Sequence, residues 1–195
     1  QYASPRPWII LQEGGDNTGG VIFHPDIIRE AADYGLYISS ENRLVDTSRG
    51  DPVPSEDGRI APMPDADVAA LREVTREEMM SRFVQRENRD FRPAFVDQAL
   101  PGGGAQIAPV IGYGITQNRD HAAPITNPHS FSAEWMRLEP GQSVGPFALD
   151  EKMVMIVHEG RLRLDYADGG NASVEVDAWD TYSVPGGAFR TLTAT

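Results

Sequence analysis

Histidines and carboxylates are the side chains in this chain whose types could bind a metal or transfer protons. The sequence has no cysteine, which excludes disulfides, thiol catalysis and thiolate metal ligands. His121 and His129 lie in a proline-containing segment, where they could hold a divalent ion together with Glu134 or Glu151. Isolated His and Glu side chains are usually solvated, so we favour the interpretation without a metal and keep this displaced site as an alternative.

Other catalytic signatures are missing. His158 follows a predicted strand in which Met153, Met155 and Val157 share one face, so His158 should face outward. No Ser-His-Asp spacing typical of a catalytic triad is present, nor a Gly-x-Ser-x-Gly elbow. The glycine-rich residues 14–20 lack the Lys-Ser/Thr of a phosphate-binding loop, and we expect a turn there.

Charge and hydropathy narrow the range of partners. The 195 residues carry a formal net charge of -12, which repels nucleic-acid backbones and anionic membrane surfaces. No apolar run approaches the roughly 20 residues that cross a bilayer. Residues 1–8 lack the basic and apolar regions of a signal peptide. We therefore expect a cytoplasmic protein without nucleic-acid or membrane partners.

Residues 1–110 are predicted to form an N-terminal arm with two or three short helices. An apolar run at Trp8–Leu11 is a candidate strand. A helix is predicted over residues 26–34, between a proline start signal and Gly35, and another runs from a cap at Asp65 or Asp67 through Val74. A third should begin at Thr75, where a capping box precedes an apolar stripe. Residues 46–65 contain four prolines and predict an extended connector.

Residues 111–195 change to short β-segments. Phe131, Ala133 and Trp135 alternate with polar neighbours, and apolar runs near residues 153–157, 162–166 and 174–176 follow. Asp168–Asn171 is typical of a hairpin turn. The predicted fold class is mainly β, with antiparallel strands preceded by the helical arm.

Turn residues in this region carry a family resemblance. Gly141 is followed by Gly160 after two apolar segments, and Asp180 later precedes Pro185 and Gly187. Their order and spacing resemble the two motifs of the cupin superfamily over about residues 125–195. The resemblance implies a jelly-roll β-barrel whose corners are formed by these Gly and Pro residues.

The same resemblance places residues that cannot bind a metal at the ligand positions. The family's two histidines and glutamate of the first motif fall on Phe147, Leu149 and Met153, and the histidine of the second motif falls on Arg190. Trp179 stands at the leading glycine of the second motif. Apolar side chains do not replace imidazole and carboxylate ligands, and a guanidinium repels a cation. We therefore expect no metal and no other cofactor.

Arg190 is the residue we expect to bind a ligand if the barrel has one. A small barrel has room for side chains or for one small ligand, and a buried guanidinium requires an anionic partner. That partner is either an internal carboxylate, which we favour, or a small organic acid. The internal candidates are Asp150, Glu151 and Asp180. The walls of the site would be formed by Phe147, Leu149, Met153, Trp135, Tyr182 and Phe189.

These observations lead to a cupin-type barrel that serves as a small-molecule-binding, structural or oligomerisation domain, expected as a homodimer. The alternative is the degenerate barrel of a two-barrel cupin enzyme, such as a gentisate-type ring-cleaving dioxygenase, with the iron in the other barrel. Metal-independent sugar epimerase or isomerase chemistry is a third reading, but the residue pair that it needs is not identified in the sequence.

Overall fold

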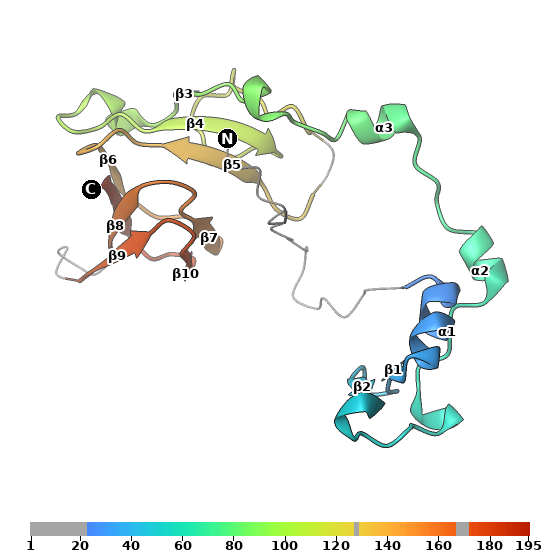
Figure 1. Cartoon of the computed structure of the whole chain (residues 1–195). Coiled ribbons are helices and arrows are strands. Elements are labelled where there is room, and N and C mark those ends of the chain that lie inside the picture. Colours follow the sequence, from blue (N-terminus) through green and yellow to red (C-terminus); the bar gives the residue numbers. More distant parts are fainter. Residues whose placement is uncertain (1–22, 127–128, 167–171) are drawn as a thin grey trace, which may run out of the picture. The chain divides into compact units, whose positions relative to one another are not determined.

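The computed structural model describes residues 23–126, 129–166 and 172–195 (Figure 1). The chain divides into two compact units, residues 1–76 and residues 77–195. The sequence-based division at residue 110 falls inside β4 (Gln106–Ile111), a strand of the second unit. The predicted strand at Trp8–Leu11, the glycine-rich turn and the Asp168–Asn171 hairpin turn lie outside the described residues.

The first unit begins with helix α1 (Pro25–Asp33). The His24 side chain accepts a hydrogen bond from the Asp26 N–H, and Pro25 stands where its missing N–H costs nothing. Gly35 ends the helix at φ +77°, and a short hairpin of β1 (Leu36–Ile38) and β2 (Leu44–Asp46) follows. The hairpin was not predicted, because two three-residue strands give no usable alternation.

The predicted connector contains more local structure than a fully extended chain. It includes two single-turn 3-10 helices, η1 (Thr47–Arg49) and η2 (Glu56–Gly58), and Arg59 forms an isolated β-bridge with Ser39. The two later helices are α2 (Asp65–Ala69) and α3 (Arg76–Met80), which begins at the boundary between the units. Three short helices are thus present as predicted, but α2 and α3 are each only five residues long, and α2 ends at Ala69, before the predicted end at Val74.

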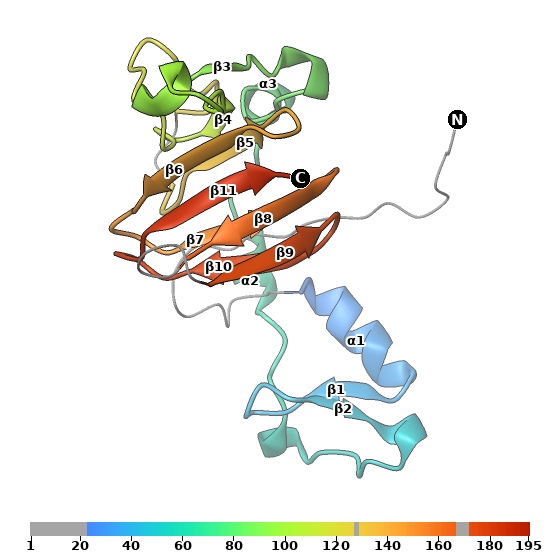
Figure 2. The same cartoon turned by 90° about the vertical axis from the view of Figure 1, so that its left-hand side faces the viewer.

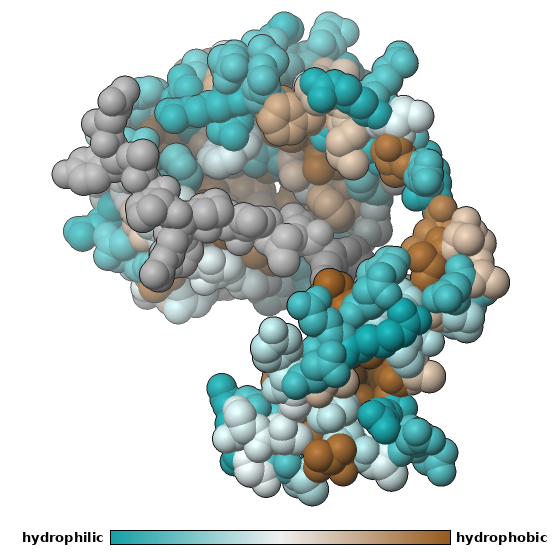
Figure 3. All heavy atoms as spheres, turned by 45° about the vertical axis from the view of Figure 1, so that its right-hand side comes forward, coloured by the Kyte–Doolittle hydropathy of each residue, from teal (hydrophilic) through white to brown (hydrophobic). Residues whose placement is uncertain are grey.

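The described part of the first unit has almost no interior. Among residues 23–76 only Pro25 is buried, and apolar side chains such as Tyr34 and Leu44 are 76% and 71% exposed. Figure 3 shows apolar residues at the surface among hydrophilic ones. This segment therefore lacks the buried apolar area from which a small domain draws its stability.

The second unit consists of antiparallel strands with short 3-10 turns, η3 (Arg86–Asn88) and η4 (Val96–Ala99). One sheet has the order β3-β4-β5, a second has the order β6-β11-β8-β9, and β7 pairs with β10 (Figure 2). The strands other than β4 are β3 (Arg92–Pro93), β5 (Ala133–Arg137), β6 (Ser143–Phe147), β7 (Met153–Ile156), β8 (Arg161–Asp165), β9 (Ser173–Asp177), β10 (Thr181–Val184) and β11 (Arg190–Ala194).

The four-stranded sheet has two chemically different faces. Val144, Leu164, Val176 and Leu192 are at most 5% exposed and point to one side, which we name the core face. Three of them form the hydrophobic core together with Ala105 and Val184. The opposite side, the solvent face, carries the charged residues Arg161, Arg163, Glu175 and Asp177. This is the period-2 alternation expected of a half-covered antiparallel sheet.

The predicted mainly β, antiparallel class with few helices is confirmed. The strand pairings among the described residues leave separate sheets and do not close into a barrel. Strand β4 was missed because Pro109 interrupts its apolar run, although it pairs with both β3 and β5. No helix in the described parts of the chain is long and apolar enough to cross a membrane.

Candidate functional site

Arg190 occupies the first position of β11, opposite Phe147 at the end of β6. It is 1% exposed and is the largest fully buried side chain of the described residues. Its neighbour on the same face of the strand is the core residue Leu192. The extended backbone after the Pro185–Gly187 corner therefore directs a permanently charged group into the core side of the sheet.

The contacts of the guanidinium leave one of its edges unsatisfied. Nη1 donates a hydrogen bond of 2.6 Å to the Ala188 carbonyl, and Nη2 lies 3.9 Å from the thioether sulfur of Met153. The Phe147 ring covers one face of the guanidinium, with 4.9 Å between Cζ and the ring centroid. Nε is buried without a hydrogen-bond partner. A thioether is a weak acceptor, so only Nη1 is well satisfied.

The favoured prediction, an ion pair between Arg190 and an internal carboxylate, is wrong for the described residues. Neither Asp150, Glu151 nor Asp180 forms an ion pair or hydrogen bond with Arg190. The Asp180 carboxylate instead accepts the N–H of Asp177 at the turn before β10. Within the described part of the chain, the charge of Arg190 is therefore balanced only by a carbonyl dipole, a thioether and an aromatic ring.

Tyr182 provides the other polar group of this region. It lies on β10 opposite Met155 of β7, and its hydroxyl donates to the Met155 sulfur at 3.2 Å. Burial raises the pKa of the Tyr182 hydroxyl above its usual value, and the nearby Arg190 charge only partly offsets this. Burial also lowers the pKa of Arg190. The hydroxyl is thus a proton donor for hydrogen bonds, and a neutral tyrosine of this kind is no general base.

Four of the residues expected around a ligand lie together here: Arg190, Phe147, Met153 and Tyr182. Leu149 contributes through its backbone, because its carbonyl accepts the Gly187 N–H at 2.7 Å and so holds the corner before β11. Phe189, expected in the wall, is 66% exposed and points away, since it alternates with Arg190.

Trp135 belongs to a different cluster. The guanidinium of Arg89 lies 3.9 Å above its ring centroid, and His158 packs against its edge with 5.4 Å between centroids. His158 is exposed, as predicted from strand alternation, and also contacts the 59% exposed Trp179. Among the described residues, no member of this cluster forms a hydrogen bond, ion pair or ring contact with Arg190.

Sequence reasoning did not assign a site role to three groups near the guanidinium. They are the Ala188 carbonyl, the Met155 thioether and Phe95, whose ring stacks on Phe147 at 6.2 Å between centroids. Met155 carried a usable signal, because it shares the parity of Met153 in β7. A backbone carbonyl leaves no trace in the sequence.

The histidines and acids of the alternative metal site do not gather. His121 is buried, donates from Nε2 to the Asp90 carbonyl at 2.8 Å and leaves Nδ1 without a partner. His129 contacts Phe131. Within residues 23–126, 129–166 and 172–195, no group of three or more His, Asp or Glu side chains is arranged to hold a metal ion.

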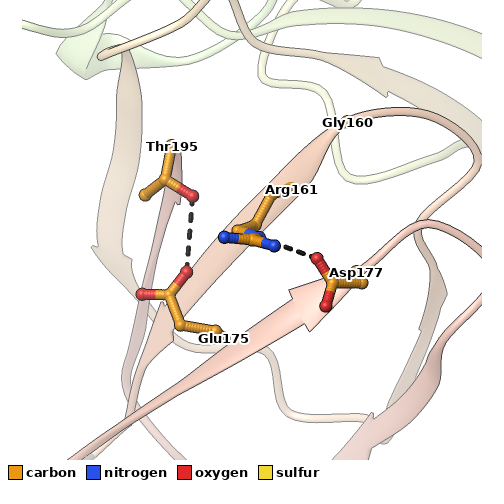
Figure 4. Close-up of a pocket in the computed structure, with 5 residues that line it drawn as sticks. All are labelled: Gly160, Arg161, Glu175, Asp177 and Thr195. Atoms are coloured by element: carbon orange, nitrogen blue, oxygen red, sulfur yellow. Dashed lines mark hydrogen bonds and ion pairs between the residues drawn. The ribbon is translucent and has the colours of Figure 1, made fainter.

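A surface hollow on the solvent face contains charged residues that are paired with one another, unlike Arg190. It is lined by Gly160, Arg161, Glu175, Asp177 and Thr195 (Figure 4). Arg161 Nε donates to the Asp177 carboxylate at 2.7 Å, and Thr195 Oγ1 lies 3.3 Å from Glu175. The polar groups of the hollow form hydrogen bonds with one another and lie in contact with solvent. They therefore need no ligand to complete their hydrogen bonding.

Comparisons with protein-family models, curated proteins and solved structures find no match for this chain. The site itself is therefore the source of functional information. It combines one buried cation, a free N–H edge, a neutral hydroxyl and apolar walls. This set can bind an anion, and it contains no nucleophile or base.

Proposed function

We propose that the second unit is a cupin-type small-molecule-binding domain that holds an organic anion on Arg190. The observation that carries the proposal is a guanidinium 1% exposed with Nε unpartnered and no carboxylate beside it in the described residues. Burying an uncompensated charge costs several kcal/mol in proteins. An anion bound in the folded state would offset that cost, and Arg190 is the group that would receive it.

The backbone at the motif positions supports the cupin resemblance. The three glycines at those positions, Gly141, Gly160 and Gly187, have φ values of +80°, +82° and +76°. Trp179, at the remaining glycine position, has φ +73°. A tryptophan rarely adopts this conformation, so the fold imposes it there. The backbone at all four motif positions thus has the positive φ that glycine favours, including the position that is occupied by Trp179.

The residues at the metal-ligand positions support the binding role. Phe147, Met153 and Arg190 come from three different strands and meet at one place, as metal ligands of the resembling family would. In this interpretation the guanidinium supplies the positive charge that a metal ion would supply. The jelly-roll topology is the finer part of the proposal, beyond the separate antiparallel sheets described above.

Thermal denaturation of the full chain with a panel of small anions tests this proposal. Acetate, hexanoate, benzoate, succinate and phosphate are compared with the Arg190→Met variant as the control that keeps volume and removes charge. At a ligand concentration of 100 times Kd, binding should stabilise the wild type by about 2.7 kcal/mol and raise its Tm, with no effect on the variant. An equal response of the variant, or no response to any anion in the wild type, would contradict the proposal.

A further inference from the structure

The unsatisfied edge of Arg190 has a defined shape. In a guanidinium, Nε–H and Nη2–H point in the same direction along one edge, and a carboxylate can accept both in a side-on, bidentate pair. Nη1 is engaged with the Ala188 carbonyl at 2.6 Å, so the end-on edge is already half occupied. Of the described residues, Met153 alone offers an acceptor to the edge formed by Nε and Nη2, with its sulfur 3.9 Å from Nη2.

From this edge and its surroundings we infer that the ligand is a monocarboxylate with an apolar body, received side-on by Nε and Nη2 of Arg190. The inference rests on the proposed function and specifies its ligand class. The carboxylate would take the place of the Met153 sulfur on Nη2 and supply the missing acceptor of Nε. Both N–H groups then gain a charged acceptor in place of a weak one or none.

The side chains around Arg190 determine which chemical groups the ligand can carry besides its carboxylate. Phe147, Met153 and Met155 are apolar and pack against the hydrophobic core. Of the charged and polar residues in the described chain, only Arg190 and His121 are buried, and His121 contacts Asp90. Among the described residues, a second anionic group on the ligand would find no second buried arginine or lysine to bind and would lose its hydration. Dicarboxylates and phosphate are therefore disfavoured.

Access requires a movement of side chains, since Arg190 is closed off in this structure. Met153 and Met155 are unbranched and adaptable, so Met153 can leave the guanidinium and Met155 can leave the Tyr182 hydroxyl without backbone rearrangement. The Tyr182 hydroxyl donates only to a thioether at present and can turn to a ligand oxygen. The two methionines thus act as the replaceable lining of the site.

A matched ligand series tests the inference by titration calorimetry. Hexanoate, adipate and hexanamide share a six-carbon chain and differ in carrying one, two or no carboxylates. Hexanoate should bind the full chain about tenfold or more tightly than either analogue, and Arg190→Lys, which keeps the charge but loses the fork, should weaken hexanoate by about tenfold or more.

Two substitutions on β7 test the same geometry from inside the protein. Met153→Glu places a tethered carboxylate beside Nη2 and should abolish hexanoate binding while raising Tm. Val154→Glu, which adds the same charge at the next, exposed position of the strand, should retain hexanoate binding and serves as the control. Loss of binding in both variants with no rise in Tm for Met153→Glu would overturn the side-on geometry.

The outcomes separate the two proposals. If adipate binds as tightly as hexanoate, or if Arg190→Lys binds hexanoate like the wild type, the inferred ligand class or fork is wrong and the anion-binding function stands. If no anion binds in a manner that depends on Arg190, both proposals fail.

Discussion

The solvent face and the core face of the β6-β11-β8-β9 sheet handle arginine in opposite ways. On the solvent face Arg161 pairs with Asp177 at 2.7 Å, and this hydrogen bond raises the pKa of Arg161. On the core face Arg190 is buried without a carboxylate partner, and burial lowers its pKa. The two residues lie on neighbouring strands that pair directly.

The contrast separates an exposed charge, which has little effect on the free energy of folding, from a buried charge, which makes folding less favourable. An exposed pair loses little solvation and contributes little, because water and salt screen it. A buried unpaired cation is a cost to the folded state and needs another reason to be present. Ligand binding is that reason in our account, and the following predictions test the contrast in order of decreasing effect.

The largest effect should come from the volume of Arg190 and not from its charge. Arg190→Ala leaves a cavity in the core side of the sheet and should lower the free energy of unfolding by about 2 to 4 kcal/mol. Arg190→Met fills most of that volume and should lie within about 1 kcal/mol of the wild type, or above it, since no ionic partner is lost. Urea denaturation of both variants measures this. Equal losses would show that the charge itself stabilises the fold.

A half-buried carboxylate should give a pH-dependent effect. Glu134 on β5 has Oε2 buried without a partner, and burial raises its pKa, with the Ile115 N–H partly offsetting this. The folded state therefore binds this proton more tightly than the unfolded state. Its stability contribution is present below the unfolded pKa and is lost as the pH rises through the folded pKa.

Glu134→Gln removes this loss. The variant should gain stability over the wild type at pH 7 compared with pH 4, measured as the difference in unfolding free energy. The exposed Glu139, replaced by Gln, is the control and should show no such gain. A variant that loses stability at pH 7 would mean that the Glu134 carboxylate is paired in solution.

The smallest effect should come from the solvent face. Arg161→Ala, Asp177→Ala and the double variant should have the same unfolding midpoints as the wild type within replicate scatter at physiological salt, because this pair is exposed. A double-mutant cycle in urea at low and high salt measures the coupling. A coupling that persists at high salt would remove the distinction between the two faces.

Sequence patterns predicted the features that depend on local chemistry. The antiparallel strands after residue 130 follow from alternation, and α1 follows from Pro25 and Gly35. The inward direction of Arg190 was implied by the family resemblance, which aligns it with the histidine of the second motif. These signals act over a few residues, which is why a single sequence contains them.

Features that depend on three-dimensional proximity were not predictable. The absence of an internal carboxylate at Arg190 could not be read from Asp150, Glu151 and Asp180, because their side-chain directions depend on the corner geometry. The separation of Trp135 from Arg190 results from its packing on Arg89 and His158. Strand β4 was hidden by Pro109.

The most direct test of the central claim observes the Arg190 Nε–H itself. In a ¹⁵N–¹H spectrum of the full chain, the Nε–H resonance absent from Arg190→Met is identified as that of Arg190 and followed during titration with hexanoate. We predict that this resonance moves downfield and exchanges more slowly with water, saturating at the affinity found by calorimetry. An Arg190 resonance that stays unchanged while hexanoate binds would contradict the account.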